Sequence, residues 1–239
     1  MLRRLLPAAL LVVIACAVAL AVALRGEDAP SVGGTGGAGA LARIGAGPAG
    51  SAVVTLRDWR YRADPDDRGR DRGWARGDWR GRPVQVPYSP NAGAVSGAAG
   101  RRAYDGSVGW FAREIAAPAA GRYAVRIESA HHAATVYVDG ERVREHVGAY
   151  EPFTARVALQ PGRHTIVVRV DWRGPRRQAD GGWARAWFNY GGLNRPVTLM
   201  RLGPSELGAL TVATRVEPGG RRARVTIGVR VRNRGPART

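Results

Sequence analysis

Short runs in which apolar and polar residues alternate recur along much of the chain. Four of them are residues 123–127, 134–138, 164–170 and 197–200. Each run is rich in β-branched or aromatic residues and is bounded by turn-forming residues, a pattern typical of half-buried β-strands. The sequence therefore predicts an all-β domain, a β-sandwich in which two antiparallel sheets pack face to face.

Tight turns separate these runs. Asp139-Gly140 stands between two of them, and Asp-Gly is a strong signal for a two-residue hairpin. Gln160-Pro-Gly-Arg163 is a second turn of a similar kind. No convincing amphipathic helix follows residue 24. We therefore expect strands across residues 123–138, with Asp139-Gly140 at the tip of a hairpin.

The first 24 residues have a different character. Arg3 and Arg4 precede an uncharged apolar stretch over residues 5–24. A stretch of about 20 such residues is long enough to cross a bilayer as a helix, and its flanking charges place the remainder of the chain outside. Three interpretations stay open: an uncleaved membrane anchor, a signal peptide cleaved near Ala21-Val-Ala23, and a lipoprotein attached through Cys16. All three predict export, with the body of the protein on the extracytoplasmic side.

Composition and periodicity divide residues 25–239 into three parts. Residues 25–50 are rich in Gly and Ala, lack apolar periodicity and are typical of a flexible linker. Residues 51–203 carry the alternating runs of the sandwich. In residues 204–239, two further runs (210–216 and 223–231) indicate a pair of strands belonging to a separate sheet. Their alternating apolar side chains lack a partner sheet, so we expect them to be exposed.

Charge and cysteine content exclude several classes of function. The formal net charge is +18, yet all 37 basic residues are arginine, as a GC-rich coding bias would produce. We therefore do not predict nucleic-acid binding, although a basic surface favours weak adhesion to acidic polymers. Cys16 is the only cysteine, which excludes a disulfide framework and a cysteine-based metal site in the exported part. We expect no cofactor and no metal.

The loop over residues 187–197 carries the strongest candidate chemistry. Adjacent glycines, Gly191 and Gly192, let another segment or a ligand approach the backbone closely. The side chains around them offer the stacking faces and hydrogen-bonding groups that sugar rings need. The predicted substrate-binding residues, with carbohydrate as the expected partner, are Trp187, Asn189, Tyr190 and Arg195.

Other polar and aromatic clusters are interpreted as structural. The acidic residues of the 64–78 segment are flanked by arginine, which indicates a solvated or ion-paired loop; they are Asp64, Asp66, Asp67, Asp71 and Asp78. Adjacent strand residues such as His131 and His132 point to opposite faces and do not readily share one metal ion. His146 is predicted to be a structural hydrogen-bonding residue. The tryptophans are predicted to fill core and interface positions: Trp59, Trp74, Trp79, Trp110, Trp172, Trp183 and Trp187.

Several segments, in order, resemble glycoside hydrolase family 2, which contains β-glucuronidases and β-galactosidases. Residues 59–87 resemble the opening of the family's N-terminal jelly roll, and residues 109–114 are similar to its Gly-x-x-Trp-Tyr strand. Residues 133–153 resemble its Val-Asn-Gly to His-x-Gly-Gly-Tyr-x-Pro-Phe signature. Residues 189–195 resemble its Asn-Tyr-(Ala/Gly)-Gly-(Ile/Leu)-x-Arg loop. The resemblance covers about residues 55–203 and implies a galactose-binding-like jelly roll.

The same resemblance implies where catalysis resides. In the family, the jelly roll precedes an immunoglobulin-like domain and a TIM barrel that carries two catalytic glutamates, one acid/base and one nucleophile. Residues 204–239 are too few for a complete immunoglobulin-like domain, so we expect only its beginning here and no catalytic residue. One departure concerns specificity: β-glucuronidases commonly have an Asp three residues before the Asn of the loop, where this chain has Ala186.

Two functions of different classes remain open. The first is the non-catalytic N-terminal portion of an exported glycosidase, which supports the active site of a barrel domain. The second is a membrane-tethered β-sandwich that binds carbohydrate or cell-envelope polymer without catalysis. The reading frame beyond Thr239 distinguishes them, because only the first requires a barrel.

Overall fold

The computed structural model describes residues 42–43, 53–94, 96–175 and 188–235. The predicted apolar helix of residues 1–24 and most of the predicted linker lie outside these residues. Within the part of the chain that is described, no helix is long and apolar enough to span a membrane.

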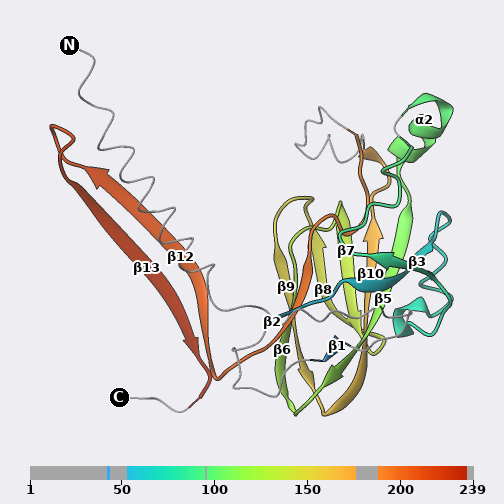
Figure 1. The fold of residues 1–239 in the computed structure, drawn as a ribbon, viewed down its shortest axis with the longest axis horizontal. Coiled ribbons are helices and arrows are strands. Elements are labelled where there is room, and N and C mark those ends of the chain that lie inside the picture. The colour runs from blue at the N-terminus through green and yellow to red at the C-terminus, as the bar shows by residue number, and fades with distance from the viewer. Residues whose placement is uncertain (1–41, 44–52, 95, 176–187, 236–239) are drawn as a thin grey trace. The chain divides into compact units, whose positions relative to one another are not determined.

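The larger of the two sheets of the sandwich has seven strands, in the order β4-β3-β5-β10-β7-β8, with β1 paired in parallel to β5 (Figure 1). The other neighbouring strands of this sheet are antiparallel. Its strands are β1 (Ala42–Arg43), β3 (Asp58–Ala63), β4 (Arg82–Gln85), β5 (Val108–Ala117), β7 (Ala133–Val138), β8 (Glu141–Val147) and β10 (Gly162–Asp171).

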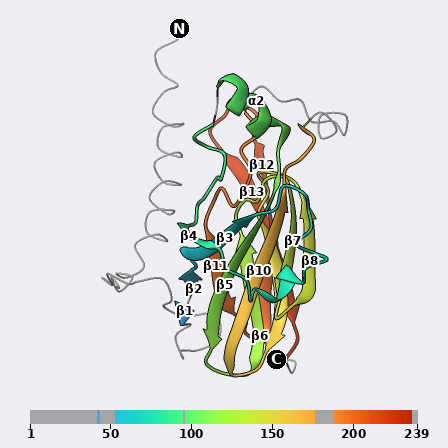
Figure 2. The same ribbon diagram turned by 90° about the vertical axis from the view of Figure 1, so that its right-hand side faces the viewer.

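The second sheet is antiparallel and has four strands, in the order β2-β11-β6-β9 (Figure 2). Its strands are β2 (Val53–Thr55), β6 (Gly121–Ile127), β9 (Phe153–Leu159) and β11 (Val197–Arg201). The two sheets confirm the predicted all-β sandwich. Residues 123–138 form the end of β6, a short connection and β7, and contain no helix.

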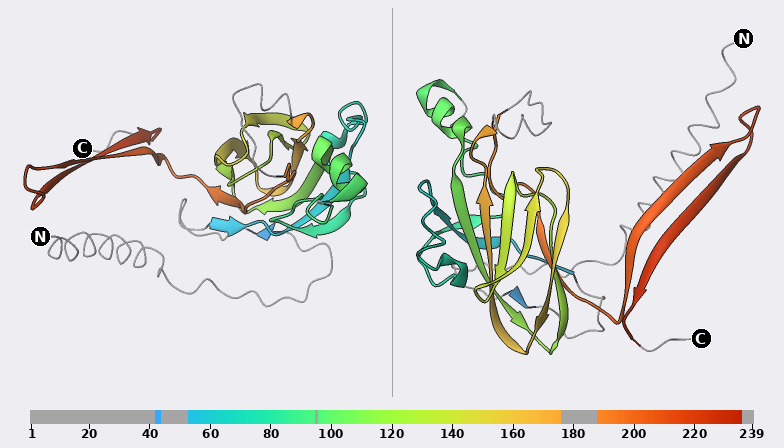
Figure 3. Two further views of the ribbon diagram at one scale, coloured as in Figure 1. Left: turned by 90° about the horizontal axis from the view of Figure 1, so that it is seen from above. Right: turned by 180° about the vertical axis from the view of Figure 1, so that it is seen from behind.

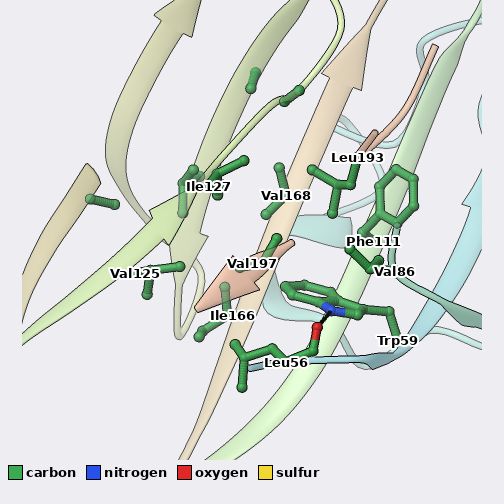
Figure 4. Packing of buried hydrophobic residues seen from close by; sticks show 14 of the residues in the cluster. Leu56, Trp59, Val86, Phe111, Val125, Ile127, Ile166, Val168, Leu193 and Val197 are labelled. Carbon is green, nitrogen blue, oxygen red and sulfur yellow. Dashed lines mark hydrogen bonds between the residues drawn. The ribbon is translucent and has the colours of Figure 1, made fainter. Parts of the chain in front are cut away.

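The main core lies between the sheets. Figure 4 shows Ile127 and Val197 of the smaller sheet packed toward Val168 and Phe111 of the larger one. Trp59 belongs to the same cluster, and its indole Nε1 donates to the carbonyl oxygen of Leu56 at 2.8 Å. Alternation along each strand sends these side chains inward, which is the physical basis of the period-two pattern in the sequence.

A second apolar cluster covers the outer face of the larger sheet. The segment between β3 and β4 contains a 3-10 turn, η1 (Trp74–Arg76), and packs Trp74 and Trp79 against Trp110 of β5. Because β5 is covered on both faces, most of its residues are buried. The five tryptophans among the described residues, which also include Trp59 and Trp172, are all buried, as predicted. Trp183 and Trp187 lie outside the described residues.

The hairpin joining β7 and β8 confirms the sequence prediction. Val138 pairs with Glu141, which leaves Asp139 and Gly140 at the tip. Both tip residues have positive φ, 52° for Asp139 and 88° for Gly140, as a two-residue hairpin turn requires.

One helix was not predicted. Helix α2 (Gly97–Asp105) lies at one end of the sandwich (Figures 1 and 2). Its only buried residue is Gly100, so it has no apolar stripe by which a helical period could be recognised. The expectation of no helix after residue 24 is therefore wrong at this position.

Strands β12 (Ser205–Val216) and β13 (Ala223–Asn233) form a separate two-stranded sheet, shown in Figure 3. The predicted exposure of its apolar residues is confirmed, since side chains on both faces are exposed, including Ile227 at 62%. Near the start of β12, Glu206 forms ion pairs with Arg122 of β6 and Arg156 of β9. The assignment of residues 204–239 to the beginning of an immunoglobulin-like domain stays a prediction.

Candidate functional site: the glycine-rich loop at one end of the sandwich

The side chain of Asn189 is enclosed at the centre of the candidate loop, with 0% of its surface exposed. Its Nδ2 donates to the carbonyl oxygens of Tyr104 and Trp172, at 2.8 Å each. Its Oδ1 lies 2.8 Å from Nε2 of His131, which must donate for this contact to be a hydrogen bond. The amide thus joins the end of α2, the end of β10 and the β6–β7 connection, and it serves the fold.

The two glycines of the loop are required by close packing. A Cβ atom at Gly191 would lie 2.1 Å from the indole of Trp172, a distance that no real contact permits. Gly192 has a φ of 104°, and a Cβ there would lie 2.5 Å from the carbonyl oxygen of Tyr88. The sequence prediction of close approach is therefore confirmed, with the protein's own core as the approaching group.

Asn91 is a second organising amide, which the sequence did not single out. Its Nδ2 donates to the backbone oxygens of Ala103 (3.1 Å) and Asn189 (2.8 Å). Its Oδ1 accepts from the backbone N–H of Gly191 at 3.0 Å. The only sequence signal was a Ser-Pro-Asn turn, because the bonded partners lie up to 100 residues away.

Among the described residues of the loop, Tyr190 is the aromatic side chain that is exposed at the surface. Tyr190 is 39% exposed, and its ring lies 5.1 Å from that of Phe188, which in turn lies 5.9 Å from that of Tyr104. Arg195 is exposed. Of the predicted sugar-binding residues, Tyr190 and Arg195 thus lie where a ligand can reach them, Asn189 lies behind them, and Trp187 is outside the described residues.

Curated proteins similar in sequence to this chain are β-glucuronidases. No protein-family model matches the chain. A β-glucuronidase from Paenibacillus borealis is 33% identical over 185 residues, a match that covers 66% of this chain and 30% of the relative. The β-glucuronidase of Homo sapiens is 29% identical over 195 residues, with the same coverage. Over this region the chain is homologous to β-glucuronidases, members of glycoside hydrolase family 2.

A solved structure agrees in fold. The β-glucuronidase from Ruminococcus gnavus in complex with D-glucaro 1,5-lactone superimposes with a TM-score of 0.61 at 22% identity, covering 75% of this chain and 34% of that chain. At this identity the likeness supports the all-β sandwich alone. The chain spans about 30% of the length of the curated relatives that it matches.

Two aspartates of the acidic segment have structural roles. Asp64 is buried and accepts from the backbone N–H groups of Arg68 and Gly69 and from the indole Nε1 of Trp110, at 2.8 Å each. These three contacts bring the turn after β3 onto β5. Because each partner is a donor, the carboxyl group acts here as an acceptor that organises the turn.

Asp67 belongs to a four-membered ion-pair network, as the sequence interpretation proposed. Arg169, with a side chain only 4% exposed, contacts Asp67 at 2.7 Å and Asp171 at 2.9 Å. Arg173 contacts the same two carboxylates at 2.8 and 2.6 Å. Burial raises the pKa of Asp171, but the hydrogen bonds from Arg173 and Arg169 outweigh it and hold that pKa below its ordinary value. The two carboxylates fasten the 64–73 turn to β10 through Arg169 and Arg173.

The histidines also have structural surroundings. The rings of His131 and His132 lie 5.7 Å apart at an interplanar angle of 72°, and His131 is held by Asn189. His146 stacks on Phe153 with ring centroids 4.2 Å apart. Burial lowers the pKa of His146, and the charge of Glu151 offsets this only in part.

Proposed function

We propose that this sandwich is the non-catalytic N-terminal portion of an exported family 2 glycosidase, in which it supports and walls an active site carried by a barrel domain. Homology to β-glucuronidases over about 30% of their length supports this role, because most of each relative lies outside the matched region. The substrate class proposed is a glycoside. A β-glucuronide is the first candidate, since the matched relatives are β-glucuronidases and one structural neighbour is described in complex with D-glucuronic acid.

The observation that carries the proposal is the construction of the 188–195 loop. Asn189 and the two glycines lock the loop onto Trp172 and α2, and the ring of Tyr190 projects from this rigid base. A loop held by buried hydrogen bonds positions an exposed side chain precisely against a neighbouring domain or a sugar. The carboxylates of Asp64 and Asp67 are engaged in holding the fold, so a support role suits the sandwich better than hydrolysis.

Turnover assays test the proposal. The chain up to Thr239 should not hydrolyse aryl β-glucuronides or aryl β-galactosides, whereas the product of its complete reading frame should hydrolyse one of them. In that complete product, Tyr190→Ala should raise KM more than it lowers kcat. Hydrolysis by the chain up to Thr239, abolished by Asp67→Asn, would show that a catalytic site lies in the sandwich and would refute the proposal.

Export is part of the same proposal and rests on the apolar stretch of residues 5–24. A fusion of residues 1–50 to alkaline phosphatase should be active only outside the cytoplasm, and Leu10→Arg in the apolar stretch should abolish that activity. An equally active Leu10→Arg fusion would argue against export by this segment.

A further inference from the structure

A shallow, open cleft with an arginine-rich lining lies where the end of β3 meets the segment leading into β4. Its volume is about 520 Å³, within the range of small-ligand sites. Residues from three separate segments line it: Tyr61, Arg62, Ala63, Arg80, Gly81, Arg82 and Pro90. The lining therefore contains three arginines and no carboxylate.

Several arginines elsewhere in the sandwich are matched by acidic groups or carbonyls. Arg169 and Arg173 share two aspartates, and Arg60 donates to the backbone oxygens of Trp79 and Gly77. Among the described residues, no ion pair engages Arg62, Arg80 or Arg82. Positive charge in a concave site without a counter-ion favours an anionic ligand.

The fold holds these arginines close to one another. Gly81 lies against β3, where a Cβ atom would be 2.8 Å from the carbonyl oxygen of Tyr61, so the residues flanking Gly81 are brought beside that strand. Arg82 pairs with Tyr61 across β3 and β4 and stacks over its ring at 5.2 Å. Its guanidinium also donates to the hydroxyl of Tyr88. Arg62 stacks over Trp74 at 3.9 Å. Two of the three guanidinium groups are therefore oriented by aromatic rings before any ligand binds.

The cleft adjoins the candidate loop. Pro90 forms part of its wall, and a Cβ atom on Gly192 would lie 2.8 Å from Cδ of Pro90. The proline ring supplies an apolar surface, and the guanidinium groups supply the forked donors that match a carboxylate. A ligand for this cleft thus combines an apolar face with a negative charge.

We propose that this cleft binds a carboxylate-bearing sugar residue, a uronic acid unit of an acidic oligosaccharide, with Arg80 and Arg82 as the groups that hold the carboxylate. The choice of a sugar rests on the proposed function, whereas the choice of an anion rests on the arginines alone. Arg80 is exposed, and no hydrogen bond or ion pair from another described residue engages its side chain, so it is the cleanest residue to test.

Binding of tetraglucuronic acid to the full chain, measured by isothermal titration calorimetry, tests this assignment. Arg80→Gln and Arg82→Gln should each weaken binding by about tenfold or more, as expected for a charge-assisted hydrogen bond. The matched control is Arg163→Gln, which removes an exposed arginine of β10 outside the cleft and should change the affinity by less than about twofold. Binding should also weaken with added salt.

Three results would overturn the assignment: no binding of tetraglucuronic acid, equal binding of the neutral cellotetraose, or equal weakening by Arg163→Gln. Tighter binding of a single-stranded oligonucleotide than of tetraglucuronic acid would also overturn it, because the ligand would then be a different class of anion. Unchanged thermal unfolding of Arg80→Gln shows that the fold is intact. Because the proposed function is judged by turnover of aryl glycosides, its failure and the failure of this binding site are distinguishable.

Discussion

The enclosed amide of Asn189 gives the sharpest test of how the candidate loop is held. Replacing it in Asn189→Ala removes three hydrogen bonds and leaves the carbonyl oxygens of Tyr104 and Trp172 and Nε2 of His131 without this partner. Each net hydrogen bond contributes about 1 kcal/mol, and each buried group left unpaired adds to the loss. We expect a decrease of about 3–5 kcal/mol in the free energy of unfolding, a large fraction of the about 5–15 kcal/mol typical of a domain.

Urea unfolding followed by tryptophan fluorescence measures this change, since the buried indoles become exposed together. The matched control is Asn194→Ala in the same loop, because the Asn194 amide donates one hydrogen bond, to the carbonyl oxygen of Tyr190 at 3.0 Å. It should cost no more than about 1.5 kcal/mol.

The variant Asn189→Asp sharpens the test further. It replaces Nδ2 by an oxygen that faces the carbonyl oxygens of Tyr104 and Trp172 and cannot donate when ionised. It should therefore destabilise at least as much as Asn189→Ala. A loss below about 1 kcal/mol for both variants, or a loss equal to that of Asn194→Ala, would refute the structural role and restore Asn189 as a ligand-binding candidate.

Three further outcomes are expected. Gly191→Ala should destabilise by more than about 3 kcal/mol in urea unfolding, because its Cβ would overlap the indole of Trp172, and recovery in a Trp172→Leu background would confirm the clash. His164 contacts Asp139 at 2.6 Å, and although burial lowers its pKa, the hydrogen bonds and the charge of Asp139 raise it overall. This contact should therefore increase the free energy of unfolding by up to about 1 kcal/mol below pH 6.5, and the increase should be lost as the pH rises through the pKa of His164 in the folded protein. If His164→Gln left the pH dependence of the unfolding free energy unchanged, this expectation would be contradicted. Ile227→Thr on exposed β13 should change the unfolding free energy by less than about 0.5 kcal/mol, and a larger loss would indicate a buried contact.

Local sequence determined the strands and their turns. Residues 134–138 alternate because one face of β7 packs in the core, and Asp139-Gly140 reverses the chain because both residues adopt positive φ. The glycine pair of the loop was also readable, since adjacent glycines indicate close approach. These features depend on neighbours within a few residues, so the sequence contains the information needed to predict them.

Tertiary structure alone decided what the polar residues do. Asn189 looked like a sugar-binding group, but its partners lie 17, 58 and 85 residues away, and only the assembled sandwich encloses its amide. Helix α2 gave no signal because just one of its residues, Gly100, is buried. The arginine cleft could not be predicted from the sequence, because arginines occur throughout a chain that has no lysine. Arg62 and Arg80 become neighbours only when β3 and β4 pair. Periodicity records which side of an element is covered, whereas the chemistry of a site depends on which distant groups the folded chain brings together.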